Sequence, residues 1–396
     1  MTTVVNLSSE SDSINSPETH TPRVAWLLQG AGAYWQPILG EFTRLISDTK
    51  VFSAEWTGFL PGFEASFRVE HVGPMKLLNL PGKSKGYGNV VAYLPPSVVK
   101  PLVAYRPDVV FTTGFSLWTM LVCALKLVFK WKVVIVYDGS SPGVDYRNSW
   151  VRSHQRRWLA RLTDAFITNN KAGQQYIVET LGVLPEKVFA RPYLLPHPKT
   201  YEAALKATQP LIDKPQQPVF VFAGNLIPRK GLLELLSACK LLVERGHQNF
   251  MLAVVGDGEQ RRELETYVEE NSLSGQVTWV GEVAYEKVGA YFNAADVFVF
   301  PTREDVWGLV LVEAMMFGKP VLASRWAGAT EMVEDGVNGY VFDPYDPERA
   351  AELMAKFIER PELIASMGAE SKRIMEDHRL EKVAKSLAEV VDFCLR

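Results

Sequence analysis

The strongest structural signal in the chain is the stretch EDVWGLVLVEAMMFGKPVLASRWAG, residues 304–328. Two carboxylates, Asp305 and Glu313, flank a Trp-Gly step, and the residues between them are mostly apolar. The preceding run ADVFVFPT predicts a buried strand, and LVLVEAMMFG predicts a helix that ends at Gly318, with Pro320 just beyond. A strand, a loop and a helix in this order form the repeating unit of parallel α/β sheets.

The same alternation of short apolar runs and longer helical patterns continues along the whole chain, as expected for βαβ units. Expected strands are RVAWLLQG, PDVVFTTG, KVVIVYDG and DAFITNN in the first half, and PVFVFAGN, FMLAVVGDG, QVTWVG, ADVFVFPT and KPVLAS in the second. A chain of 396 residues is longer than one hydrophobic core usually serves. We therefore predict an α/β protein with two doubly wound Rossmann-like domains that face each other across a cleft.

The domain boundaries follow from composition. Residues 1–21 are rich in Ser, Thr, Asn and Glu and lack the basic start and apolar core of a secretory signal, so we expect a disordered leader. The first domain is predicted over 22–195, and a proline-rich linker without regular structure over 196–217. The second domain is predicted over 218–380, followed by a helix over 381–396 that packs back on the first domain.

Composition excludes several classes of protein. The net charge is only −3, with 47% hydrophobic and 22% charged residues, which fits a globular protein that does not bind nucleic acid. The three cysteines are far apart and the six histidines are dispersed, so we predict no disulfide, no metal site and a cytoplasmic location. The apolar segment from Phe115 is interrupted by lysines, so a helix and a strand are favoured over a membrane span.

The loop before the 309–318 helix is a candidate anion site, because it presents the backbone N–H groups of Gly308, Leu309 and Val310. Asp305 lies just before the first turn and Glu313 about one turn inside the helix. Carboxylates accept hydrogen bonds from hydroxyls, so this spacing suits a diphosphate between two sugars, as in a nucleotide sugar. The alternative is that Glu313 only solvates its helix and Asp305 is an ordinary charge near a helix N-terminus.

Three further strand-end loops favour the ligand interpretation. The segment AGNLIPRKG places two cations beside a helix start, where they suit a pyrophosphate. The Gly-Asp-Gly loop of VVGDGEQ and the loop of WVGEV follow the next two strands. The candidate donor-binding residues in these loops are Gly224, Asn225, Arg229, Lys230, Gly256, Asp257, Gly281 and Val283.

On these motifs the second half, from about Val219 to Asp346, resembles the retaining glycosyltransferases of family 4, which have the GT-B fold. The motifs are G-x-L-x-x-x-K-G, G-D-G, V-x-x-x-G, carboxylate-x7-carboxylate, A-M-x-x-G-x-P-V and G-A-x-E. The resemblance implies that Glu313 holds the ribose, Asp305 the transferred sugar, and Arg229 and Lys230 the diphosphate. It continues through GATEMVEDGVNGYVFDPYD, which by itself predicts an ordinary hairpin.

The chain departs from the family pattern at two positions. Asn225 stands where the family usually has arginine, and Arg229 is close enough in the loop to present a guanidinium to the same phosphates. Asp305 stands where the family usually has glutamate, which shortens the reach toward the sugar by one methylene.

The first half resembles the family more weakly, as expected of a domain that shapes an acceptor pocket. Gly30 and Gly32 follow its first strand in a loop that can approach the donor phosphates, although a tight strand-to-helix turn explains them equally well. Asp138, at the end of KVVIVYDG, is a candidate to orient an acceptor hydroxyl, with an N-cap or turn aspartate as the alternative.

The segment DYRNSWVRSHQRRWLARLTD carries five arginines against two aspartates, with Trp150 and Trp158 on one side of the predicted helix. Such a mixture suits the anionic surface of a membrane and a lipid-linked acceptor. A solvated helix face is the alternative. Peripheral contact at the inner face of a membrane therefore stays open.

The function expected from these observations is transfer of a sugar from a nucleotide-diphosphate sugar to a hydroxyl acceptor, with retention at the anomeric carbon and without a cofactor. The retaining mechanism comes from the family resemblance. Two other functions stay open: a sugar-nucleotide epimerase on a similar scaffold, and a regulator that binds nucleotide sugars without turnover. Asn225 is the feature that favours the regulator, whereas the epimerase requires acid and base groups, for which Asp305 and Asp138 are the candidates.

Overall fold

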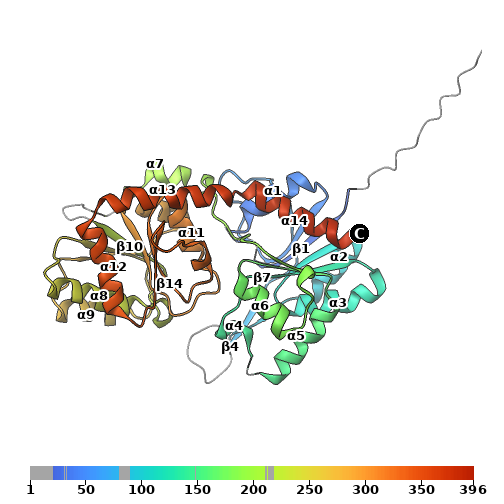
Figure 1. Ribbon diagram of the computed structural model, residues 1–396. Coiled ribbons are helices and arrows are strands. Elements are labelled where there is room, and N and C mark those ends of the chain that lie inside the picture. Colours follow the sequence, from blue (N-terminus) through green and yellow to red (C-terminus); the bar gives the residue numbers. More distant parts are fainter. Residues whose placement is uncertain are drawn as a thin grey trace, which may run out of the picture.

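The computed structural model has two α/β domains, joined by two crossings of the chain (Figure 1). The expected leader, except for Thr21, lies outside the residues that the structure describes. Described are residues 21–30, 32, 34–79, 90–147, 149–209, 212 and 218–396.

The N-terminal domain is built on a parallel sheet of seven strands in the order β3-β2-β1-β6-β7-β8-β9. Its strands are β1 (Val24–Gly30), β2 (Thr49–Glu55), β3 (Arg68–His71), β6 (Val109–Thr113), β7 (Lys132–Tyr137), β8 (Ala165–Thr168) and β9 (Val188–Ala190). An antiparallel pair, β4 (Lys76–Asn79) and β5 (Val90–Tyr93), stands apart from this sheet. Its helices are α1 (Gln36–Leu45), α2 (Val99–Tyr105), α3 (Leu117–Phe129), α4 (Pro142–Asp145), α5 (Trp150–Leu162) and α6 (Lys171–Gln175).

The C-terminal domain has a parallel sheet of six strands in the order β12-β11-β10-β13-β14-β15. Its strands are β10 (Val219–Ala223), β11 (Met251–Val255), β12 (Val277–Gly281), β13 (Val297–Phe300), β14 (Val321–Ser324) and β15 (Gly339–Phe342). Its helices are α8 (Leu232–Glu244), α9 (Arg261–Glu270), α10 (Val288–Ala294), α11 (Leu309–Met316), α12 (Pro347–Glu359) and α13 (Glu362–Asp377).

The strand order in each sheet reverses beside its first strand. β1 has β2 on one side and β6 on the other, and β10 has β11 on one side and β13 on the other. Loops diverge at such switch points, and ligands of open α/β sheets collect there. Every residue of β10, β11 and β13 is buried, and burying each Val or Phe side chain contributes roughly 1.5–3 kcal/mol.

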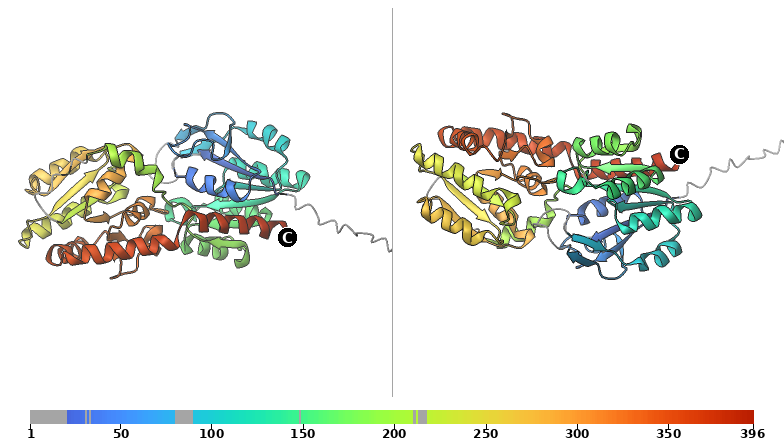
Figure 2. Two further views of the ribbon diagram at one scale, coloured as in Figure 1. Left: turned by 90° about the horizontal axis from the view of Figure 1, so that it is seen from above. Right: turned by 90° about the horizontal axis from the view of Figure 1, so that it is seen from below.

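The segment expected to be an irregular linker contains helix α7 (Lys199–Ala207), which packs against α10. The prolines precede the helix or lie beyond its end, so they do not interrupt it. The second crossing follows α13. Helix α14 (Leu380–Leu395) packs along α1 of the N-terminal domain, as both views in Figure 2 show.

The hairpin expected within residues 328–346 is wrong. A short 3₁₀ turn (Gly328–Met332) leads instead into β15, which pairs with β14 in parallel at the edge of the sheet. The Asp335–Asn338 turn made the segment resemble a hairpin, but the strand before it belongs to the interior of the same sheet. Within the described ranges, the helices are too short or too polar to cross a membrane.

Candidate active site

The predicted donor loops converge on one cavity of about 780 Å³ at the carboxyl ends of β10, β11 and β12. Among its lining residues are most of the candidates from these loops: Gly224, Asn225, Arg229, Lys230, Gly256, Asp257, Val283, Leu309, Val310 and Glu313. Gly281 ends β12 with a φ of 84°, which turns the chain toward Val283. The structure therefore brings most of these candidates together around one cavity.

Helix α11 points its N-terminus at the cavity. Gly308 precedes it with a φ of 91°, a conformation that suits glycine, and a Cβ there would meet Phe300 at 2.7 Å. Leu309 and Val310 form the first turn and line the cavity, whereas Gly308 does not. First-turn N–H groups have no acceptor within their own helix, so they are suited to an anionic ligand.

Close packing of two loops shapes the cavity floor. The ideal Cβ position of Gly256 lies 2.0 Å from the carbonyl oxygen of Gly224, so any side chain there would push the β10 and β11 loops apart. Asp257 accepts a hydrogen bond from the Gly258 backbone N–H at 2.7 Å, which fixes its carboxylate within the turn. Asn225 has an exposed side chain at the cavity wall.

Glu313 is buried, with 3% exposure, and its carboxylate is held by tyrosines. Tyr285 donates a hydrogen bond to Oε1 at 2.7 Å, and the hydroxyls of Tyr201 and Tyr285 are 3.1 Å apart. Burial raises the pKa of Glu313 above its usual range, and the tyrosine hydrogen bonds partly offset that rise. The result is a buried acceptor that lines the cavity and is already oriented.

Asp305 is paired with the two predicted phosphate cations. The Lys230 ammonium lies 2.7 Å from Asp305 Oδ2, and the Arg229 guanidinium lies 3.4 Å from the same oxygen. Arg229 also donates to the Glu304 carbonyl at 2.6 Å, so it holds the loop that carries Asp305. The structure thus brings Asp305 to the edge of the 780 Å³ cavity through Lys230.

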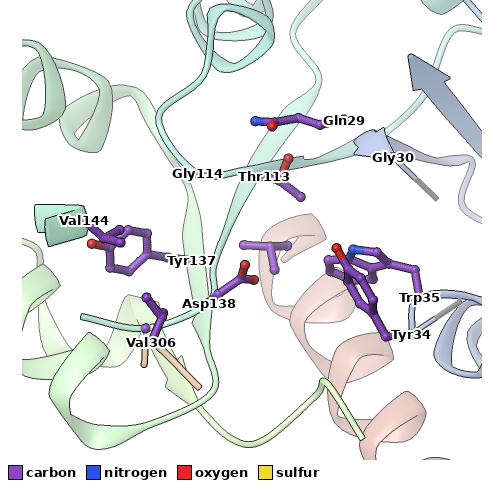
Figure 3. Close-up of a pocket in the computed structure, with 12 residues that line it drawn as sticks. Gln29, Gly30, Tyr34, Trp35, Thr113, Gly114, Tyr137, Asp138, Val144 and Val306 are labelled. Atoms are coloured by element: carbon purple, nitrogen blue, oxygen red, sulfur yellow. The ribbon is translucent and has the colours of Figure 1, made fainter. Parts of the chain in front are cut away.

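Asp138 and Gly30 line a second, smaller cavity of about 270 Å³ in the N-terminal domain. Figure 3 shows the Asp138 carboxyl between the side chain of Tyr137 on one side and those of Tyr34 and Trp35 on the other. Gly30 therefore lies with Asp138 and does not line the 780 Å³ cavity. Gly32 lies between two residues outside the described part of the chain and does not line either cavity.

The environment of Asp138 disfavours its charge. Loss of hydration on burial raises the pKa of Asp138 above its usual range, although a hydrogen bond donated by Tyr193 OH acts in the opposite direction. Its side chain is still exposed to solvent through the cavity. An aspartate with these properties can exchange a proton with a hydroxyl of a bound molecule.

A third cavity, of about 720 Å³, lies between the two domains and is lined by Asp305, Glu304 and Glu331 on one side and by Ser140 and Ala172 on the other. Val306, beside Asp305, also lines the Asp138 cavity. The loop that follows β13 therefore stands where all three cavities approach one another. Within the described ranges, no group of three or more His, Cys, Asp or Glu side chains is arranged so that it could hold a metal ion.

Sequence reasoning missed the tyrosines that lie around the carboxyl groups of Glu313 and Asp138. Tyr201 comes from α7, inside the segment expected to be a linker, and Tyr193 lies just before that segment. Of these tyrosines, only Tyr285 could have been found from the sequence, because it lies two residues after Val283 in a loop already predicted to bind the ligand. Long-range partners such as Tyr201 have no local sequence signal.

One prediction about the basic helix is corrected. Arg156 is one of the five arginines in the segment expected to suit an anionic membrane surface, but it is buried, with 7% exposure. Its guanidinium donates to the carbonyls of Val144 and Asp145 and to Tyr176 OH. The helical repeat places Arg156 against the domain core, where its guanidinium stabilises the folded domain through these hydrogen bonds.

The comparisons with known proteins agree with this geometry. Residues 206–374 match the family described as glycosyl transferases group 1. The chain is 30% identical over 178 residues to a D-inositol 3-phosphate glycosyltransferase of Streptomyces griseus, covering 43% of this chain and 38% of that protein. It is also 30% identical over 182 residues to a GDP-mannose-dependent α-(1-6)-phosphatidylinositol monomannoside mannosyltransferase of Mycobacterium tuberculosis, covering 44% of this chain and 47% of that protein. The matches span less than half the length of these curated relatives.

Solved structures show the fold over most of the chain. HepE from Anabaena, in complex with UDP, superposes with a TM-score of 0.72 at 18% identity, over 93% of this chain and 99% of that one. A sucrose-phosphate synthase from Thermosynechococcus elongatus gives a TM-score of 0.67 at 19% identity, over 93% and 98% of the two chains. The chain therefore has the GT-B fold of two Rossmann-like domains, and its residues 206–374 are similar to the glycosyl transferases group 1.

Proposed function

We propose that the protein transfers a sugar from a nucleotide-diphosphate sugar to a hydroxyl acceptor, with retention at the anomeric carbon. The observation that carries the proposal is the cavity lined by Glu313, Lys230 and the first turn of α11, because it combines a hydroxyl acceptor, a cation and a helix N-terminus. HepE, which has the same fold, is solved with UDP and with UDP-glucose, which supports a nucleotide sugar as the donor class.

In this proposal each group acts on one part of the donor. Glu313 accepts hydrogen bonds from the ribose hydroxyls, and Lys230, Arg229 and the α11 N-terminus hold the diphosphate. Asp305 binds the hydroxyls of the transferred sugar. Gly224, Asn225, Gly256, Asp257, Gly281 and Val283 shape the walls that the nucleotide contacts.

The reaction breaks the bond between the anomeric carbon and the diphosphate oxygen. The acceptor oxygen then bonds to the same face of the sugar, and its proton passes to the departing diphosphate. Negative charge grows on that diphosphate in the transition state, where Lys230 and the helix N-terminus stabilise it. The donor needs no cofactor in this scheme, since the chain's own cations neutralise the leaving group.

The acceptor is proposed to enter through the cavity that contains Asp138. That cavity opens toward Val306, beside Asp305, so a hydroxyl there is close to the proposed sugar position. Asp138 orients the acceptor hydroxyl, and Tyr193 holds Asp138 in place. Holding two reactants in the right geometry lowers the free-energy barrier by several kcal/mol, because the entropy of bringing them together has already been lost on binding.

The experiment that tests the proposal is incubation of the protein with UDP-, GDP- and ADP-sugars, with and without candidate acceptors, while free nucleotide is measured. A transferase releases nucleotide from one donor class, and an acceptor accelerates the release. An epimerase interconverts the sugar without any demand for an acceptor. A regulator binds nucleotide but releases none from any donor, which would overturn the proposal.

We also propose that the N-terminal domain works in peripheral contact with a membrane, where the acceptor is lipid-linked. Helices α3 and α5 pack together, and Lys126 on α3 bonds the Leu162 carbonyl of α5 at 2.8 Å. Large apolar side chains are exposed on this pair of helices: Met120, Leu127, Val128, Phe129, Trp150, Val151 and Trp158. Exposed aromatic and aliphatic side chains beside Lys130, Arg157 and Arg161 suit the surface of an anionic bilayer.

A further inference from the structure

The loop that carries Asp305, together with the Gly328–Met332 turn that carries Glu331, is bonded across the domain interface at several points. The bonds are Gly143 N to Glu304 Oε1 at 2.7 Å, Asn170 Nδ2 to the Val306 carbonyl at 3.0 Å, Lys171 N to Glu331 Oε1 at 2.9 Å, and Trp307 Nε1 to the Leu194 carbonyl at 2.8 Å. Each joins a residue of the N-terminal domain to a residue of the C-terminal domain. The loop is therefore fixed by both domains, although its sequence belongs to one.

Asn170 is the most constrained member of this set, with 2% exposure. Its Oδ1 accepts a hydrogen bond from Gly173 N at 2.8 Å and so caps α6, while its Nδ2 donates to the Val306 carbonyl. Both ends of the side-chain amide are used, and exchanging them would lose both bonds. The residue thus links a helix of one domain to the catalytic loop of the other.

Two glycines allow the domains to approach this closely. A Cβ on Gly328 would lie 2.3 Å from Asn170 Nδ2, and a Cβ on Gly139 would lie 2.7 Å from the Val306 carbonyl oxygen. Gly139 comes from the N-terminal domain and Gly328 from the C-terminal domain. Gly139 therefore leaves room for the Val306 carbonyl of the other domain, and Gly328 leaves room for the Asn170 side-chain amide.

The glutamates at this interface accept hydrogen bonds from first-turn N–H groups. Gly143 lies in the first turn of α4 and Lys171 is the first residue of α6, and such N–H groups have no acceptor within their own helix. Glu304 and Glu331 supply the acceptors from the opposite domain. Opening the interface would return these N–H groups to water.

We propose that Asn170, Glu304 and Glu331 form a cross-domain clamp that positions Asp305 for the reaction. Glu304 is the neighbour of Asp305, and its carbonyl also accepts from Arg229, so a shift of Glu304 moves the Asp305–Lys230 pair. The three clamp residues act through Asp305 and are positioning residues. The inference rests on the proposed transfer reaction, because only that reaction needs the acceptor side and the donor side aligned.

The substitution Asn170→Asp isolates the clamp from folding. Aspartate keeps an oxygen that caps α6, but it replaces the donor to Val306 with a second acceptor facing a carbonyl. We expect nucleotide affinity to stay within about twofold, because the donor cavity lies in the other domain, and kcat to fall about tenfold or more. Asn271→Asp, at the end of α9 and away from the interface, is the matched control, and it is expected to leave both values unchanged.

Hydrogen exchange reads the clamp without reference to catalysis. The N–H groups of Gly143 and Lys171 are protected by Glu304 and Glu331, so their exchange reports whether the interface is closed. Asn170→Asp should increase exchange at both N–H groups and leave strand β11 unchanged. Equal exchange in wild type and Asn170→Asp would overturn the clamp.

A pair of substitutions at Glu304 gives an independent test. Glu304→Gln keeps an oxygen acceptor for Gly143 N, whereas Glu304→Ala removes it. We expect Glu304→Ala to lower kcat and to increase exchange at Gly143, and Glu304→Gln to restore most of both. If Glu304→Ala keeps the wild-type kcat, positioning through Glu304 is wrong. If wild-type protein releases nucleotide from no donor, the transfer proposal is wrong, and the exchange comparison alone decides whether the clamp exists.

Discussion

The hydroxyl of Tyr285 donates a hydrogen bond to Glu313 Oε1 at 2.7 Å, at a site where the glutamate is almost completely buried. Burial is the largest influence on Glu313, and it raises the pKa of this carboxyl. The protein therefore maintains a carboxylate where the charge is disfavoured. Such an arrangement is typical of residues retained for function at a cost in stability.

The first prediction follows from the sign of this shift. Because the pKa of Glu313 is higher in the folded chain than in the unfolded chain, its contribution to stability is fully present below the unfolded pKa and is lost as pH rises through the folded pKa. Glu313→Gln should therefore raise the melting temperature at neutral pH, and the difference should shrink as the pH is lowered. Thermal unfolding at several pH values measures it, with Glu270→Gln on exposed α9 surface as control. A lower melting temperature for Glu313→Gln at neutral pH would contradict this argument.

The second prediction concerns Lys230, which lies 2.7 Å from Asp305 Oδ2 and lines the proposed donor cavity. In the proposed reaction, Lys230→Ala removes the cation that stabilises the departing diphosphate, so kcat should fall by about 10²–10³ while nucleotide affinity changes much less. Steady-state kinetics with the accepted donor measure both quantities. Lys240→Ala on α8 is the control. Equal losses in affinity and in kcat/KM would show that Lys230 only anchors the ground state.

The third prediction separates two neighbouring arginines of α5. Arg156→Gln should destabilise the protein by about 3 kcal/mol, because it removes charged hydrogen bonds to buried carbonyls and to Tyr176. Arg157→Gln, on the exposed side, should change stability by less than about 0.5 kcal/mol. Urea unfolding of the two variants measures the difference. Similar stabilities would mean that the buried contacts of Arg156 contribute little.

The fourth prediction tests membrane contact through the exposed cations of α5 and the end of α3. Replacing Lys130, Arg157 and Arg161 with Gln should release the protein from anionic vesicles, since each cation contributes about 1 kcal/mol near such a surface. Added salt should have the same effect, because it screens the same attraction. Co-sedimentation with anionic and with neutral vesicles measures binding, and release of nucleotide from the donor in solution is the control. Wild-type protein that fails to bind anionic vesicles at low salt would remove the membrane proposal.

The parts of the fold that the sequence predicted are those with a local signal. Runs such as VFVFA and VFVF are buried on both faces, so their composition alone indicates central strands. The edge strands β3 and β15 are only partly buried and lack such a run, so β3 was missed and β15 was predicted as part of a hairpin. The interior strand β2 was also missed, whereas the edge strand β12 was predicted. Helix α7 was missed because the prolines around it dominated the pattern.

The candidate site residues also divide into those with a local sequence signal and those without one. Gly308 and Lys230 lie in strand-end loops and Glu313 lies one turn inside α11, and their short-range spacing marks them as candidates. Asn170, Tyr193 and Tyr201 act through contacts with residues far away in the chain, so no spacing within the sequence marks them. The burial of Arg156 was also beyond a local pattern, because it depends on Tyr176 and on the carbonyls after Pro142.

The measurement that most directly tests the donor site is the affinity of a ribonucleoside diphosphate and of its 2′,3′-dideoxy form for wild-type protein and for Glu313→Gln, by calorimetric titration. If Glu313 holds the ribose, wild type should favour the ribose form by about 1.5–3 kcal/mol per charged hydrogen bond, and Glu313→Gln should lose most of that preference. A preference of the same size in both proteins would show that Glu313 does not contact the ribose and would contradict the proposed site.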